Sequence, residues 1–341
     1  MNRAASVSER VLADIGKVAR MDRVDRIKTF KASGFVLSNL KSCQSCPSLL
    51  IVFSPARTRS LTLAVLFCLL LAGCARGGGD PVISPDTARR ELFLRGYDYK
   101  PAVFLDAAKD GDTLGVKLFL IAGMSPEVRN DAGETPLLLA ARYDHAQAAR
   151  ALLERGADVN ARDKRGFTPL MRAVLNGSME TVQTITEFKP DLNAQTTDPD
   201  PNTSGSTALM YAVAKDRKDV LDMLLDAGAD INESDVVVGP ALTWAAAYDR
   251  EEIAADLLER GADANVVNNV GGTPLIVAAS KGNPRLVRML LDHGADPLWK
   301  MKDGKNALQV AQETRRADAL KVLQEAVAAK KKRPGEGAQT K

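Results

Sequence analysis

One leucine-class position recurs along the chain at a nearly constant interval. Five of the six intervals are 33 residues long, and the remaining one, from Leu170 to Leu209, is 39. The position is occupied by Phe104, Leu137, Leu170, Leu209, Leu242, Leu275 and Leu308. A fixed period of this length is typical of a solenoid, in which each unit buries its apolar face only against its neighbours. The sequence therefore predicts seven stacked units, with six extra residues inserted after the third leucine-class position.

Short motifs recur at fixed places within each period. Thr-Pro-Leu stands at 135–137, 168–170 and 273–275, where the threonine caps a helix and the proline occupies its first turn. Paired alanines follow at 107–108, 140–141, 245–246 and 278–279, and let helices of neighbouring units approach closely. Paired leucines come next, and then a glycine suited to the left-handed conformation that ends a helix. These motifs predict two helices in each unit.

Together the motifs resemble the ankyrin-repeat family. The resemblance implies an all-α repeat fold, an ankyrin solenoid of about seven helix-turn-helix units with β-hairpin fingers, over residues 86–332. A helix at 87–95, with Leu92 and Phe93, is expected to cover the open end of the stack. Residues 333–341 form a polar tail.

The family resemblance also implies where a partner binds, at the finger tips and on the concave face made by the first helices. The implied contact residues are Arg142, Tyr143, Asn176, Tyr211, Lys215, Trp244, Tyr248 and Lys281. Tryptophan, tyrosine and arginine dominate binding hot spots, so these aromatic residues along one groove favour protein binding. Packing between helices is the open alternative, and it suits Tyr211 and Trp244 best.

The third unit departs from the pattern. It has Lys189-Pro190-Asp191 where other units have Gly-Ala-Asp, and Thr186 in place of the second leucine. The inserted residues fall in the loop 196–206, TTDPDPNTSGS. Asp198 and Asp200 resemble the start of a calcium loop, but the glycine and glutamate that such a loop requires are absent. A longer, acidic contact finger is the preferred interpretation.

A leader precedes the repeats. Residues 57–73 comprise two arginines and an apolar run that is too short to span a bilayer. The last three of these residues and the next one read Leu71-Ala72-Gly73-Cys74, which resembles the bacterial lipobox. The resemblance implies a signal peptide, lipidation of Cys74, and a flexible tether over 74–85. Ala75, rather than aspartate, follows the cysteine. By resemblance to Gram-negative lipoproteins, we therefore expect lipid anchoring in the outer membrane, facing the periplasm.

Residues 1–56 are an unusual extension ahead of a signal peptide. Our hypothesis is a mis-assigned start, with the true start near residues 49–52; a real cytoplasmic extension is the alternative. Cys43 and Cys46 form a C-x-x-C without the further ligands that a structural zinc site needs. We expect no metal site there.

Composition disfavours several functions. Residues 1–73 hold 11 Lys+Arg and 4 Asp+Glu, so the remainder carries 35 and 39, a formal charge of −4 that disfavours nucleic-acid binding. The two histidines, His145 and His293, have no nucleophile at a convergent spacing, and no phosphate-binding glycine loop is present. We therefore expect no enzyme, catalytic residue, cofactor or small-molecule substrate.

Three functional hypotheses follow. The first is a membrane-anchored periplasmic module that binds another protein as an adaptor, inhibitor or immunity-type protein. The second is an envelope-maintenance or oxidative-stress support protein. The third is an intracellular ankyrin adaptor in which the lipobox is unused.

Overall fold

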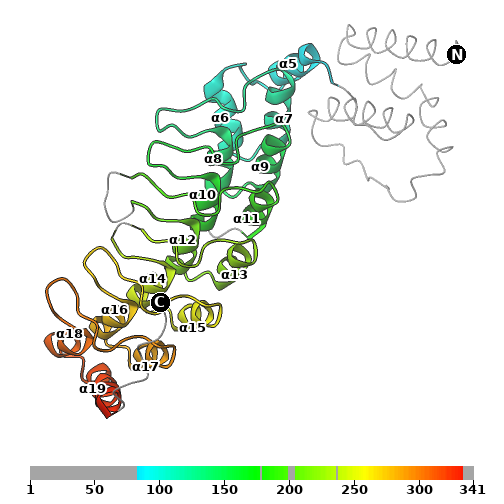
Figure 1. The fold of residues 1–341 in the computed structure, drawn as a ribbon. Helices are drawn as coiled ribbons and strands as arrows, with labels where there is room; N and C mark the ends of the chain where they lie inside the picture. The colour runs from blue at the N-terminus through cyan, green and yellow to red at the C-terminus, as the bar shows by residue number, and fades with distance from the viewer. Residues whose placement is uncertain (1–82, 177–178, 199–203, 236, 333–341) are drawn as a thin grey trace, which may run out of the picture. The chain divides into compact units, whose positions relative to one another are not determined.

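The computed structural model describes residues 83–176, 179–198, 204–235 and 237–332. These residues form one N-terminal helix, α5 (Pro85–Leu94), followed by seven helix pairs that stack side by side (Figure 1). The first helices of the pairs are α6 (Pro101–Lys109), α8 (Pro136–Arg142), α10 (Pro169–Asn176), α12 (Ala208–Ala214), α14 (Ala241–Tyr248), α16 (Pro274–Lys281) and α18 (Ala307–Glu313). The second helices are α7 (Thr113–Ile121), α9 (Ala146–Leu153), α11 (Met179–Thr186), α13 (Lys218–Asp226), α15 (Glu251–Glu259), α17 (Pro284–Asp292) and α19 (Ala317–Lys332). The seven predicted units are confirmed.

Threonines cap four of the seven first helices, α8, α10, α12 and α16, whereas α6, α14 and α18 follow Lys100, Pro240 and Asn306. The hydroxyl of Thr135 accepts a hydrogen bond from the backbone N–H of Leu138 at 3.3 Å, and that of Thr273 accepts one from Ile276 at 3.4 Å. Each satisfies an amide that has no partner within the helix. In α8 and α16 a proline follows the capping threonine, so its missing N–H removes no helical bond.

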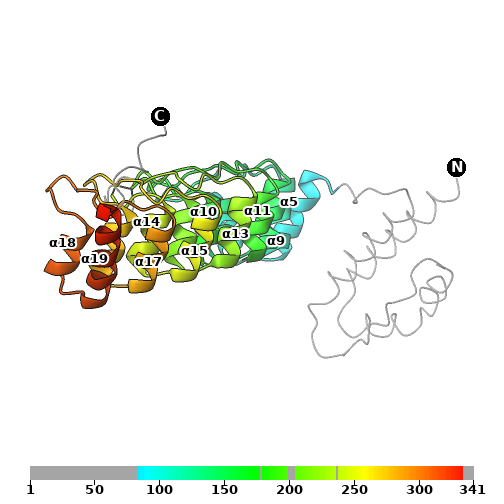
Figure 2. The same cartoon turned by 60° about the horizontal axis from the view of Figure 1, so that its bottom comes forward.

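The fingers between units are tight turns. In one of them the backbone N–H of Asp163 donates to the carbonyl of Phe167 at 3.2 Å. Neighbouring fingers are joined by a bond from Lys164 N–H to the Ala132 carbonyl at 3.1 Å, one period apart. Within the described residues the only β-bridge is an isolated antiparallel one between Ser234 and Pro240. The expected β-hairpins are therefore reduced to this one bridge and to turns. Figure 2 shows the fingers along one edge of the helix stack.

A ladder of asparagines joins consecutive units within the same connections that carry the fingers, between the second helix of one unit and the first helix of the next. The side-chain oxygen of Asn160 accepts from the backbone N–H of Asp191 at 2.8 Å, and the Oδ1 of Asn193 accepts from Asp230 at 2.8 Å. The same bond recurs from Asp263 to Asn232 and from Asp296 to Asn265. The Gly-Ala-Asp-x-Asn residues are therefore structural turn-formers, as their recurrence predicts.

The core runs continuously through the stack. The paired alanines of the first helices are fully or almost fully buried, and the leucines of the second helices pack beside them. At the N-terminal end Leu92 of α5 is buried against the first pair, as expected. Phe93 does not cover that end: its side chain is 78% exposed, because the two residues are consecutive and a helix turns them to different faces.

In the third unit, a residue just after the second helix has a strained backbone conformation. The glycines that end the second helices have φ between 82° and 97°, and they are Gly123, Gly156, Gly228, Gly261 and Gly294. Lys189 occupies the equivalent place with φ of 54°. A side chain other than glycine in this left-handed region costs roughly 1–2 kcal/mol. The unit also buries Thr181, where its neighbours bury Ala148 and Val220, and Thr184, where the preceding unit buries Ala151.

We expect residues 178–206 to exchange amide hydrogens before residues 240–295. Lys189→Gly should relieve the left-handed strain, raise the free energy of unfolding by about 1 kcal/mol and slow exchange in this segment. Hydrogen exchange and denaturant melts of both chains measure the two effects.

Gly156→Lys is the matched control, since a Cβ at Gly156 would meet no atom within 4 Å. This change should lower stability by a similar amount. Uniform exchange across all units, or no effect of either substitution, would contradict the assignment.

Candidate partner-binding surface

Five of the predicted contact residues occupy one register in consecutive units. They stand at or just after the end of a first helix, and all are exposed: Tyr143, Asn176, Lys215, Tyr248 and Lys281. We call this set the end row. Tyr143 is 42% exposed and Tyr248 is 48% exposed, so both rings are accessible to a partner. The structure brings these predicted residues together on one side of the stack.

The backbone fixes how the end row projects. The residue after each row member in units two, four, five and six adopts a left-handed φ, and these residues are Asp144, Asp216, Asp249 and Gly282. That conformation ends the helix. Each of the three aspartates is also held by the following unit, as when Arg250 Nη1 donates to Asp216 Oδ2 at 3.0 Å. Lys215 and Lys281 form no ion pair with any described residue.

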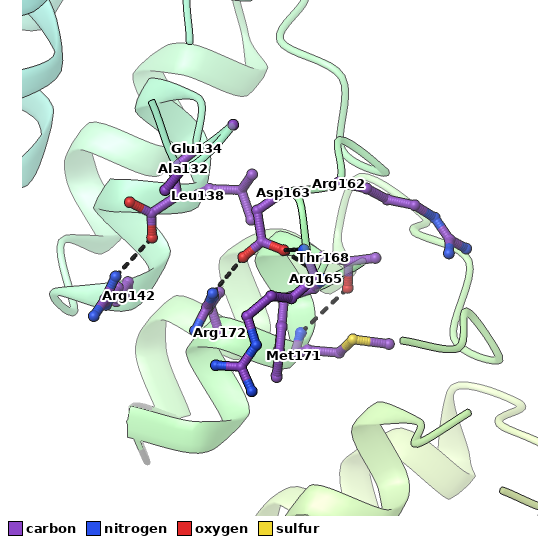
Figure 3. A network of polar contacts seen from close by, with 12 residues as sticks. Ala132, Glu134, Leu138, Arg142, Arg162, Asp163, Arg165, Thr168, Met171 and Arg172 are labelled. Atoms are coloured by element: carbon purple, nitrogen blue, oxygen red, sulfur yellow. Dashed lines mark hydrogen bonds and ion pairs between the residues drawn. The ribbon is translucent and has the colours of Figure 1, made fainter. Parts of the chain in front are cut away.

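Cations surround Tyr143. The ammonium of Lys109 lies 5.6 Å from the ring centroid, and the guanidinium of Arg142 lies 5.7 Å from it. Arg142 Nη1 also donates to Glu134 Oε1 at 2.7 Å (Figure 3). Burial alone would raise the pKa of Glu134, but hydrogen bonds from Asn130 and Arg142 lower it below its usual value. Arg142 is therefore exposed but already tied to its own finger.

A column of aromatic rings in contact leads to Tyr248 of the end row. Phe167 and Tyr211 stack at 5.6 Å between centroids, Tyr211 meets Trp244 edge-on at 6.4 Å, and Trp244 stacks on Tyr248 at 5.6 Å. Tyr211 is 5% exposed and Trp244 is 4% exposed. Their burial favours the packing alternative over partner contact, and the finger that carries Asp235 covers Trp244. Trp244 in turn supports the exposed ring of Tyr248.

Buried acids connect the fingers to the first helices. The carboxylate of Asp163 pairs with Arg172, whose guanidinium lies 4.2 Å from the Phe167 centroid (Figure 3). Two units along, Asp235 accepts from Trp244 Nε1 at 2.8 Å and from the backbone N–H of Val238 at 2.7 Å. In both units the acid and its helix partner are nine residues apart, so the same register fixes each finger.

The acidic finger differs from its prediction. Asp198 is buried and pairs with Arg165, so it does not present a free carboxylate to solvent. Arg165 in turn lies over the Phe167 ring at 5.3 Å. Asp200, like Cys74, lies outside the described residues. The described part of the insertion therefore joins two fingers rather than forming an acidic contact.

The sequence analysis missed Trp299. This residue lies in the finger before α18 and is 39% exposed. Leu298, the preceding residue, is also exposed, as is Val270, which precedes the Gly271 to which the indole donates a hydrogen bond. Trp299 is one of only two tryptophans in the chain, and that rarity was the available signal. The expected groove positions follow the alanine pairs, so a finger residue fell outside them.

Both histidines hydrogen-bond to backbone carbonyls near helix ends. His145 Nε2 lies 2.9 Å from the carbonyl oxygen of Lys109, the last residue of α6. His293 Nδ1 lies 2.8 Å from the carbonyl oxygen of Met289, in the last turn of α17. Among the described residues no group of three or more histidine, cysteine or acidic side chains is placed to hold a metal ion.

Trp244→Phe should lower the free energy of unfolding by about 2 kcal/mol, since it removes a hydrogen bond to a buried carboxylate. The partner affinity of the folded fraction should not change. A denaturant melt and a binding titration on the same variant measure both. Trp299→Phe is the matched control: its indole donates only to a backbone carbonyl near the surface, and we expect a loss of about 1 kcal/mol or less. Equal losses would refute the packing role.

Comparison with protein families identifies the repeat. The model described as "Ankyrin repeats (3 copies)" matches residues 104–196 and 242–333, more than half of the chain, and "Ankyrin repeat" matches residues 204–236. Among curated proteins, the chain is 41% identical over 54 residues to "Ankyrin repeat-containing protein P1E11.10" of Schizosaccharomyces pombe. That match covers 16% of this chain and 26% of the relative.

Solved structures are similar over a longer stretch. The ankyrin repeat domain of human ASB11 is 26% identical with a TM-score of 0.56, covering 70% of this chain and 99% of that one. The ankyrin repeat domain of Bcl-3, a member of the IkappaB protein family, is 27% identical with a TM-score of 0.58, covering 65% and 97%. The chain belongs to the ankyrin-repeat family.

Proposed function

We propose that this protein is a lipid-anchored module of the bacterial envelope that binds another protein with the end row. It acts as an adaptor, inhibitor or immunity-type protein facing the periplasm, and it catalyses no reaction. The observation that carries the binding proposal is the alignment of Tyr143, Asn176, Lys215, Tyr248 and Lys281 in one exposed register over five consecutive units.

Rigidity supports the end row as a contact surface. Its two tyrosines are held before any partner arrives, Tyr248 by stacking on Trp244 and Tyr143 beside two cations. Binding therefore sacrifices little side-chain freedom. Aromatic side chains of this kind supply most of the energy at protein interfaces. Lys215 and Lys281, which form no ion pair with any described residue, lie in the units on either side of that of Tyr248 and add polar contacts at its rim.

The sequence before the repeats supports the anchor. The apolar run before Cys74 ends in a lipobox-like motif, and acyl chains on that cysteine would bind the membrane through about 0.8 kcal/mol per buried CH₂. Among the residues with described structure, no helix combines the length and apolar character needed to cross a bilayer. In this proposal the attachment depends on Cys74, and Ala75 after it favours the outer membrane.

Cys74→Ser should abolish lipid attachment, because the thiol is the acceptor of the lipid. Incorporation of labelled palmitate into the expressed chain is the measurement, and processing of the precursor should stop as well. A serine variant that still takes up label would refute the anchor without affecting the binding proposal.

Tyr143→Ala should weaken binding by about thirtyfold, equivalent to the 2 kcal/mol typical of a hot-spot aromatic. Affinity capture from solubilised envelopes identifies the partner, and titration with that purified partner measures the change.

Tyr99→Ala is the matched control, since Tyr99 is a similarly exposed tyrosine that lies outside the end row. It should leave affinity unchanged, and melts of both variants correct for any loss of folded protein. If the two substitutions weaken binding equally, the end row is not the contact surface.

A further inference from the structure

An exposed apolar cluster lies on the last two fingers, away from the end row positions. Val270 is in the turn before α16, and Leu298 and Trp299 precede α18. All three side chains are exposed, although most large apolar residues of the repeats are buried. Exposed apolar groups gathered in one place often mark interaction sites.

Two hydrogen bonds hold the cluster together. Trp299 Nε1 donates to the Gly271 carbonyl at 2.9 Å, and the Lys302 backbone N–H donates to the Val270 carbonyl at 3.1 Å. The indole is therefore fixed across the neighbouring finger with its polar atom satisfied, and part of the residue stays accessible, since Trp299 is 39% exposed. Such a fixed, half-exposed tryptophan can bind a partner without first being ordered.

Charges of both signs lie beside the cluster: the carboxylate of Asp303 lies 4.0 Å from the ammonium of Lys305, and two lysines stand apart from that pair. Lys300 and Lys302 are exposed and form no ion pair with any described residue. Lys305, by contrast, is neutralised by Glu313 at 2.6 Å, and the nearby Asp296 is neutralised by Lys330 at 2.6 Å. We call Val270, Leu298, Trp299, Lys300 and Lys302 the Trp299 surface. It combines an apolar centre with two lysines that form no ion pair with any described residue.

We propose that the Trp299 surface binds an acidic segment of a protein partner that carries an apolar side chain. The apolar side chain packs on Trp299 and Val270, and the carboxylates lie beside Lys300 and Lys302. Charge complementarity selects this occupant, because bringing carboxylates to these two lysines is favourable and bringing further cations is not. The inference rests on the proposed function in that it assigns a second contact, with its own chemistry, to the same protein-binding module.

Random peptides displayed on phage are the probe. They are selected on the full chain, and the enriched peptides are synthesised and titrated by fluorescence anisotropy. We expect them to contain aspartate or glutamate next to an apolar residue. Trp299→Ala should weaken their binding by about thirtyfold, and the double substitution Lys300→Gln, Lys302→Gln should weaken it about tenfold and reduce its salt dependence.

Phe93→Ala is the matched control, because Phe93 is an exposed aromatic residue on α5 at the other end of the stack. It should leave the affinity unchanged, and melts of every variant establish that each is folded. Vesicles of zwitterionic lipid with and without anionic lipid form a second arm. Binding to anionic vesicles that depends on Trp299 would identify a membrane surface as the occupant and overturn the proposal.

Other outcomes separate this inference from the proposed function. Enriched peptides that lose affinity with Tyr143→Ala but not with Trp299→Ala would overturn the Trp299 surface and leave the end row standing. Peptides that depend on Trp299 alone support the inference even if the end row fails. Peptides that are basic, or recovery of no peptide dependent on Trp299, would also overturn the inference.

Discussion

Close packing between adjacent units is the constraint on which the rest of this structure depends. Each pair of helices is too small to bury its own apolar face, so its stability comes from the neighbours on both sides. The buried alanine pairs allow the first helices to approach closely, and the asparagine ladder fixes the spacing at the turns. The end row is exposed and therefore free of this close packing, whereas Trp299 hydrogen-bonds to the neighbouring finger.

The fingers are held to this stack by buried polar groups. Asp163 and Asp235 each use one carboxylate to satisfy backbone amides of a finger and a side chain of the following helix. A buried charge left without such partners would be strongly destabilising. The same contacts bury the aromatic column, which in turn supports Tyr248. The position of the exposed Tyr248 ring therefore depends on these buried polar contacts.

Much of the architecture could be predicted from the sequence. The helix pairs, their caps, the turn-forming aspartates and asparagines, and the weak third unit all follow from motifs that act locally. The end row could also be predicted, because its residues share one place in the period. The burial of Tyr211, Trp244 and Asp198 could not be predicted from the period, since it depends on the contacts that the fingers make.

The sequence by itself determined the number of units and the residues that cap many of the helices, because capping, close alanine contacts and left-handed turns depend on residues within one period. Only the tertiary structure decided which aromatic residues are exposed. Trp244 and Tyr248 lie one helical turn apart and share a face, and their rings stack at 5.6 Å. The finger that carries Asp235 covers Trp244, while Tyr248 at the helix end lies beyond its reach.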